Sequence, residues 1–144
     1  MPSSTLTKYY DFVEQLGKGT HNLASNQLKV ALTNAAPNVS THTVLADITQ
    51  ISTSGGYTGG AGGGLTLDSV TYTESAGTGS LAASDEVLTA SGTVGPFRYA
   101  VLYNNTPASP VDPLIGYWDY GSAITLSTGE TFTLDFGSTI LTIT

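Results

Sequence analysis

The sequence predicts an all-β fold: a single antiparallel β-sandwich or jelly-roll-like domain with a short N-terminal helix or arm. Thr, Ser and Gly are abundant among the 144 residues and only 10% are charged, which is typical of strands joined by many turns. Short runs with alternating apolar residues recur along the chain, and no helical pattern lies between them after residue 17. A chain of this length can bury a core without disulfides or metals, and it contains no cysteine.

The chain divides into an N-terminal arm with a short helix, residues 1–26, and a sandwich domain, residues 27–144. Within residues 5–16, apolar side chains at helical spacing form a stripe of Leu6, Tyr9, Tyr10, Val13 and Leu16. The following glycine, Gly17, is well placed to end the helix. Because so short a helix is stable only when its stripe is packed, we expect it to lie on its own sheet or on a neighbouring subunit.

Two strands are expected at the centre of the domain, at residues 97–103 and 114–120. In the first strand, a side-chain period of two places Phe97, Tyr99, Val101 and Tyr103 on one face. The second strand carries aromatic rings on both faces, which is typical of a strand buried in a core or at a subunit contact.

Further strands are expected at residues 27–33, 43–51, 65–74 and 138–144, with loops at 34–42 and 75–86. Residues 124–126 and 132–136 alternate on either side of the turn 127–130, which predicts a hairpin. Residues 52–64 contain seven glycines in thirteen positions. This composition predicts an exposed, flexible loop with Tyr57 at its tip or base, and no Gly-Lys-Ser/Thr follows as in a phosphate-binding loop.

The charge is unevenly distributed. Residues 1–30 contain three lysines and two acids, whereas residues 31–144 contain a single arginine, Arg98, and nine carboxylates. A body with one basic residue cannot neutralise a series of phosphates, so we expect no nucleic-acid partner. No apolar run is long enough for a membrane span, and no signal-peptide pattern is present, so neither is expected.

No residue pattern predicts catalysis or a cofactor. His21 and His42 lie near predicted loops, and no G-x-S-x-G motif accompanies them. Asp112 and Asp119 could act as paired carboxylates if their strands adjoined, but both lie among turn residues, where aspartate commonly binds local backbone amides. Arg98 is expected to pair with an acid such as Asp119 or Asp135, within the fold or across an interface. The sequence therefore favours a non-enzymatic protein without metal or cofactor.

The aromatic residues leave a binding function open. If exposed, Tyr57, Tyr117, Trp118 and Tyr120 could stack against a sugar ring. A strand that is apolar on both faces is more often part of a core or an oligomer interface, so carbohydrate binding is the lesser alternative.

Four long stretches of the chain resemble small virion structural proteins of tailed bacteriophages. They are KYYDFVEQLGKGTHNLASNQLKVALTN, TVLADITQIS, GPFRYAVLYNNTP and DPLIGYWDYGSAITLSTGETFTLDF, and they lie between residues 8 and 136. Members of this family are virion proteins, and the narrower role that we infer is a capsid decoration (cement) protein on the outer head surface. The resemblance implies no catalytic residues.

The resemblance implies the major capsid protein as a partner, after synthesis in the host cytoplasm. A β-rich body with few charges can bury its strand edges against further copies of this chain, and closed symmetry is compatible with a trimer or another ring, with a trimer favoured. Residues 1–26 are expected to carry much of the attachment, so that deleting residues 1–20 would leave the sandwich folded but unable to bind capsids. A phage tail component (tube, terminator or tip) remains the structural alternative. The candidate capsid or subunit contacts are Leu6, Tyr9, Tyr10, Val13, Lys18, Tyr57, Arg98 and Trp118.

Overall fold

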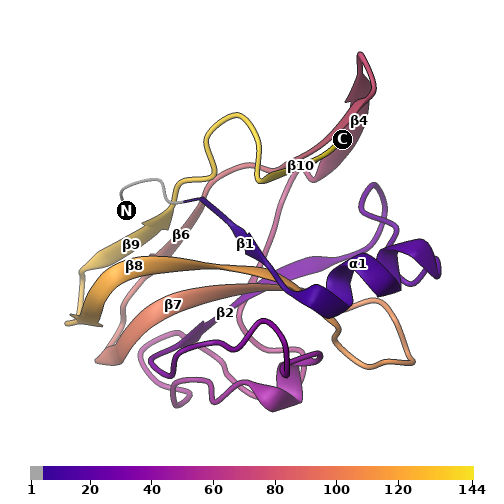
Figure 1. Ribbon diagram of the computed structural model, residues 1–144. Helices are drawn as coiled ribbons and strands as arrows, with labels where there is room; N and C mark the ends of the chain where they lie inside the picture. The colour runs from indigo at the N-terminus through magenta and orange to yellow at the C-terminus, as the bar shows by residue number, and fades with distance from the viewer. Residues whose placement is uncertain (1–4) are drawn as a thin grey trace.

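The computed structural model describes residues 5–144 and confirms the all-β class, with antiparallel sheets and one short α-helix (Figure 1). The N-terminal elements are β1 (Thr7–Lys8), α1 (Tyr10–Gly17), β2 (Leu28–Thr33) and the 3-10 helix η1 (Leu45–Asp47). The remaining strands are β3 (Leu65–Thr66), β4 (Thr71–Ser75), β5 (Thr78–Ala82), β6 (Glu86–Thr89), β7 (Val94–Asn104), β8 (Leu114–Leu126), β9 (Thr131–Leu134) and β10 (Leu141–Ile143).

The described strands form three antiparallel sheets. The central sheet has the order β1-β8-β7-β2-β3, a smaller sheet has the order β10-β5-β4, and β6 pairs with β9 alone. In Figure 1 the β4–β5 hairpin and β10 project away from the central sheet at the upper right, while β6 and β9 lie at the left. Residues of the two smaller sheets cover one face of the central sheet, which gives a sandwich-like arrangement.

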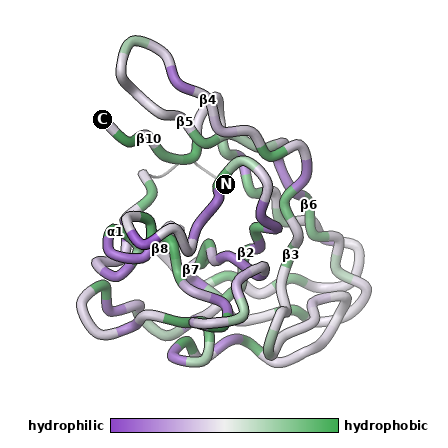
Figure 2. The backbone as a smooth tube through the Cα atoms, turned by 90° about the vertical axis from the view of Figure 1, so that its right-hand side faces the viewer, coloured by the Kyte–Doolittle hydropathy of each residue, from purple (hydrophilic) through white to green (hydrophobic). Residues whose placement is uncertain are grey.

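The larger core lies between these layers. It joins apolar side chains of the central sheet, such as Leu102 and Trp118, to Leu81 of β5 and to Leu134 of β9. Figure 2 shows hydrophobic stretches along β7 and β10, whereas the outer loops are mainly pale or hydrophilic. Burial of these apolar side chains is the main contribution to the stability of the sandwich.

A second core lies on the opposite face of the central sheet. It contains Ala31, Val101, Tyr103 and Leu114 from the strands, with Tyr9 from the N-terminal segment and Leu45 and Ile48 from the η1 region. The segment after β2 therefore covers the second face of the sheet. This arrangement explains why β2 is buried on both faces, as its near-continuous apolar sequence requires.

The predicted central pair is confirmed, but its strands are longer and less regular than alternation predicts. β7 pairs with β8 from Val94↔Leu126 to Tyr103↔Leu114, with three register shifts. One shift separates Phe97↔Ile124 from Tyr99↔Asp119. As a result Phe97 enters the larger core, while Val101 and Tyr103 enter the second core, so the predicted single aromatic face is wrong.

The helix packs on its own domain, but Phe12 faces the core in place of Tyr10 and Val13 of the predicted stripe. Helical structure begins only at Tyr10, because Thr7–Lys8 pairs with β8 and Tyr9 donates its backbone N–H to the Ile115 carbonyl. Phe12 is therefore the buried helical residue, and Leu16, one turn later, packs against the same core. The predicted stripe is wrong in part because it treats Leu6 and Tyr9, which lie in an extended segment, as helical residues.

Three other expectations are wrong in part. Residues 43–51 contain η1 and no strand. The turn at 127–130 forms, but β8 continues to pair with β7 while β9 crosses to β6, so the expected hairpin is absent from residues 5–144. Residues 75–86, expected as a loop, contain β5, which forms a hairpin with β4. In the last two cases the partner strand decided the pairing, which the local pattern does not encode.

The glycine-rich segment is held in place by side chains from several elements. Lys29 Nζ donates to the Gly62 carbonyl at 2.7 Å, and Tyr103 Oη donates to the Gly63 carbonyl. Tyr57 is 1% exposed, and its hydroxyl accepts the Leu32 N–H at 2.9 Å. Much of the segment is exposed, as expected, and Tyr57 lies buried at its base. Glycine is needed at Gly64, where φ is +95° and a Cβ would lie 2.2 Å from the Val30 oxygen.

Candidate functional site

The eight candidate contact residues fall into buried and exposed groups. Tyr9, Tyr57 and Trp118 are at most 5% exposed, and Leu6 is half-buried against the larger core. These three buried side chains do not offer the surface that the interface hypothesis requires. Tyr10, Val13 and Lys18 are exposed on or beside α1, and Arg98 is half-exposed on β7. The structure thus reduces the candidate surface to one helix face and one ion pair on the sheet.

The outer face of α1 presents two large apolar side chains to solvent. Tyr10 is 67% exposed and Val13 is 65% exposed, and their spacing of three residues places them side by side on the helix. Near the end of the helix, Lys18 Nζ pairs with Glu14 Oε1 at 2.5 Å. The helix itself is anchored by Phe12, which is 1% exposed. We call Tyr10 and Val13 the helix patch.

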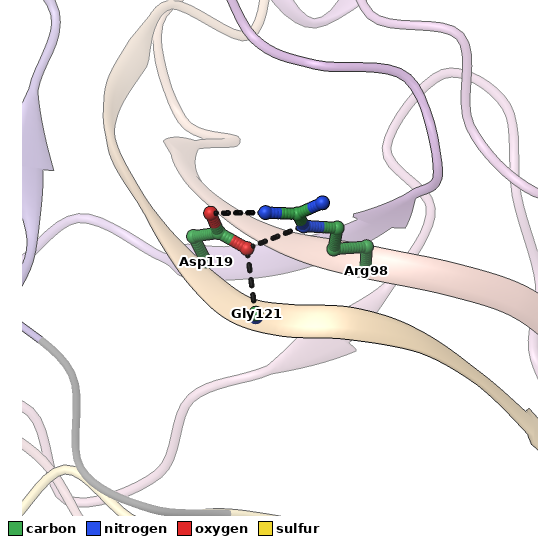
Figure 3. Close-up of polar contacts among 3 residues, drawn as sticks. All are labelled: Arg98, Asp119 and Gly121. Atoms are coloured by element: carbon green, nitrogen blue, oxygen red, sulfur yellow. Dashed lines mark hydrogen bonds and ion pairs between the residues drawn. The ribbon is translucent and has the colours of Figure 1, made fainter.

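Arg98 forms the expected ion pair with Asp119, within the fold (Figure 3). Arg98 Nε donates to Asp119 Oδ1 at 2.8 Å and Nη2 donates to Oδ2 at 3.1 Å. Asp119 Oδ1 also accepts the Gly121 N–H at 2.8 Å. Hydrogen bonds from Arg98 lower the pKa of Asp119. The pair connects β7 and β8 where their register is irregular. Arg98 is therefore already paired within the fold.

The structure does not support an exposed aromatic platform for sugar binding. Trp118 is 5% exposed, and its ring centroid lies 5.5 Å from that of Phe136 in the larger core. Burial raises the pKa of Tyr57 to about 12, consistent with a hydroxyl enclosed by the fold. Tyr117 is half-buried between Tyr9 and Tyr99. Tyr57 and Trp118 are therefore part of the core, which is the alternative to sugar binding that rings on both faces of a strand indicate.

The two histidines have structural contacts. His21 is 6% exposed, packs on Phe12 with ring centroids 5.2 Å apart, and lies with Nδ1 3.1 Å from the Asn104 amide nitrogen. Burial lowers the pKa of His21 to about 4. His42 Nδ1 accepts the Asn38 N–H at 3.1 Å in the loop after β2. Each ring therefore stabilises a local arrangement, and His21 connects the N-terminal segment to β7.

Sequence reasoning missed an apolar groove beside η1. The groove has a volume of about 540 Å³, and its lining includes Val44, Leu45, Ile48, Ile51, Ala61 and Val111. Asp112 also lines it and is 6% exposed. The sequence assigns Asp112 to an ordinary turn. It does not show that Asp112 contacts Gly62 while Asp119, seven residues later, pairs with Arg98. Only the folding of residues 44–61 against the 108–113 loop creates this site.

Neither a metal-ligating cluster nor a membrane-spanning helix is present among residues 5–144. No three His, Asp or Glu side chains gather as a metal ion would require. None of the helices in this range has the length and apolar character to cross a membrane. Among the described residues, the helix patch and the groove beside η1 are two candidate surfaces for function. Comparison with family models, with curated proteins and with solved structures finds no match to this chain.

Proposed function

We propose that this protein is a non-enzymatic structural component of a tailed-phage virion. Its most specific form is a capsid decoration protein that binds the outer head surface and stabilises it through subunit contacts. The proposal begins from the four stretches that resemble phage virion proteins. Its partners are the major capsid protein and other copies of this chain, with a trimer favoured.

The observation that carries the proposal is the helix patch. Tyr10 and Val13 expose about two thirds of their surface, although the chain buries most of its other large apolar side chains. An exposed aromatic and aliphatic pair on an anchored helix is suited to a protein contact, because no conformational ordering is needed before it packs. The arm that bears it, residues 1–26, also contains two of the four basic residues, Lys8 and Lys18.

Open strand edges support self-association. β4 is an outer strand of the three-stranded sheet, and most of its residues are exposed. β1 and β10 are outer strands as well. Unpaired backbone groups on such edges can extend a sheet into a second copy, and a closed ring removes the edges from solvent.

Part of the segment 1–20 is built into the fold. Removing residues 1–20 would delete Tyr9 and Phe12, which are 0% and 1% exposed, and the β1 pairing with β8. We therefore expect the truncated protein to be destabilised, so loss of binding would carry no information about the contact. Surface substitutions in the helix patch are the sharper test.

The proposed function is tested with purified full-length protein and expanded, undecorated heads of the phage that encodes it. We expect a defined oligomer in solution, measured by light scattering, and co-pelleting with heads that saturates at a fixed ratio to capsid subunits. Absence of co-pelleting at saturating protein would overturn the decoration role. Assembly into rings or tubes without head binding would instead assign the protein to the tail.

A further inference from the structure

The groove beside η1 combines an apolar lining with a buried carboxylate. Leu45 and Ile48 form buried parts of the groove, being 2% and 8% exposed, whereas Val111 stands at the surface and is 59% exposed. The volume of about 540 Å³ lies within the range of 300–1,000 Å³ typical of ligand sites. The groove is therefore large enough to accept more than one side chain of a binding partner.

Asp112 places negative charge in this apolar surrounding. Its Oδ2 accepts the Gly62 N–H at 3.2 Å, and its backbone carbonyl accepts the Leu45 N–H at 2.9 Å. Among residues 5–144 the ion pairs are Lys18–Glu14 and Arg98–Asp119, so Asp112 has no cationic partner there. Buried carboxylates are normally paired with a cation, because burial without one is costly.

The one lysine near this loop does not satisfy Asp112. Lys29 Nζ donates to the Gly62 carbonyl at 2.7 Å, on the same glycine whose N–H binds Asp112. The lysine thus fixes the glycine loop and leaves the carboxylate without an ion pair. A cation delivered from outside the chain could complete the site.

Hydrogen bonds within the chain hold the walls of the groove together. Gln50 Nε2 donates to the Gly60 carbonyl at 2.9 Å, and Tyr57 Oη donates to Gln50 Oε1 at 2.9 Å. Gly59 donates its N–H to Thr53 Oγ1 at 2.9 Å. These bonds hold the glycine-rich wall against the segment after η1, so binding requires little ordering of the chain.

We propose that this groove binds an arginine or lysine side chain presented by an extended segment of a partner protein. The aliphatic stem packs on Val44, Ile51 and Val111, and the charged head binds the Asp112 carboxylate. The remaining volume accepts apolar neighbours of that basic residue. The acidic body, with one arginine and nine carboxylates after residue 30, favours approach of a basic segment.

This inference rests on the proposed function in one respect: the partner that presents the basic segment is then a protein of the head shell. The chemistry of the groove is tested separately. The probe is n-butylguanidinium, which reproduces the stem and head of arginine, and the neutral alcohol 1-pentanol is its control. Amide chemical shifts of Gly62, Val111 and Asp112 report binding by NMR.

We expect saturable shifts with n-butylguanidinium and at least about tenfold weaker binding of 1-pentanol, because the alcohol lacks the charge-assisted hydrogen bond. Asp112→Asn should weaken guanidinium binding by a similar factor. Asparagine tolerates the φ of 51° at this position and still accepts the Gly62 N–H, so the fold should be retained. Asp68→Asn removes the same charge at an exposed position outside the groove and should leave binding unchanged.

A second pair of variants tests the location. Ala61→Phe fills the groove from its exposed rim and should abolish the shifts, whereas Ala36→Phe places the same ring on the surface elsewhere. Absence of saturable binding by n-butylguanidinium overturns the proposal. It is equally overturned if 1-pentanol binds as well as the cation, or if Asp112→Asn binds the cation as well as the wild type.

The same variants separate this inference from the proposed function. If the wild type decorates heads and Asp112→Asn and Ala61→Phe decorate them equally well, the groove is not the contact and the decoration role stands. If both variants lose decoration while Asp68→Asn and Ala36→Phe retain it, the groove is a second contact with the head, in addition to the helix patch. If the wild type fails to decorate heads, the proposed function fails, and the guanidinium titration alone decides the groove.

Discussion

Arg98 and Asp119 are joined by a two-point ion pair at the place where β7 and β8 lose their regular register. On one side of the pair Phe97 opposes Ile124, and on the other Tyr99 opposes Asp119, so β8 has extra residues between these points. Asp119 also accepts the Gly121 N–H within that extra stretch. The pair therefore holds the irregularity that sends Phe97 to one core and Val101 to the other.

Arg98→Lys should loosen this irregularity with little effect on global stability. Lysine cannot reproduce the two-point geometry, and the pair is half-exposed to solvent. We expect faster hydrogen exchange at the Gly121 amide and an almost unchanged unfolding midpoint. The lowered pKa of Asp119 means that the pair contributes above the usual aspartate value of 3.8 and is lost as pH falls below it. Unchanged exchange at Gly121 in the variant would show that the pair does not hold the register.

Trp118→Ala should destabilise the protein by about 3–5 kcal/mol, because it removes a large side chain from the core. Trp118 is 5% exposed and packs on Phe136. The measurement is urea unfolding, with Trp118→Phe as a control that keeps an aromatic ring. A Trp118→Ala variant of wild-type stability that had lost binding to a glycan would instead restore the sugar-binding alternative.

Gly64→Ala should cost more stability than Gly60→Ala, although both glycines have positive φ. A Cβ at Gly64 would meet the Val30 oxygen at 2.2 Å, whereas nothing lies within 4 Å of a Cβ at Gly60. We expect about 1–2 kcal/mol for Gly60→Ala from the left-handed backbone alone, and a larger loss for Gly64→Ala. Equal unfolding free energies for the two variants would contradict the close approach of this loop to β2.

Stability should fall on acidification because of His21. Its folded pKa of about 4 lies below the ordinary value of 6.5, so the unfolded chain binds the proton more readily between these values. The contribution is complete above pH 6.5 and decreases as pH falls towards 4, by up to about 3 kcal/mol. Urea unfolding from pH 7 to pH 4 measures it. His21→Gln should flatten this dependence, and a variant with the wild-type pH profile would assign the loss to other groups.

The sequence predicted a strand correctly where the apolar residues of the pattern are buried in the sheet. Residues 27–33 and 114–120 were predicted well, because β2 and the first half of β8 are buried within the central sheet. The 43–51 segment was wrong because Leu45 and Ile48 are buried by a 3-10 turn that covers the sheet, and a short apolar run does not distinguish the two.

The candidate site was less predictable than the fold. Tyr10 and Val13 are exposed, as a contact surface requires, but the same predicted stripe included Tyr9, which a strand pairing draws into the second core. Asp112 acquires its surroundings from residues 44–61, far from it in sequence. Long-range placement of this kind has no local signal, since it depends on which segment covers which face.

The most direct test of the decoration role is the binding ratio of a helix-patch variant to undecorated heads. Tyr10→Ser with Val13→Ser should leave the unfolding free energy within about 1 kcal/mol of the wild type, because both side chains are exposed. Phe12→Ala, by contrast, should cost about 3–5 kcal/mol. We expect wild-type protein to saturate the heads at a fixed ratio and the folded double variant to bind at least tenfold more weakly, the equivalent of about 1.4 kcal/mol. A double variant that saturates heads with wild-type affinity would contradict the assignment of the helix patch as the contact.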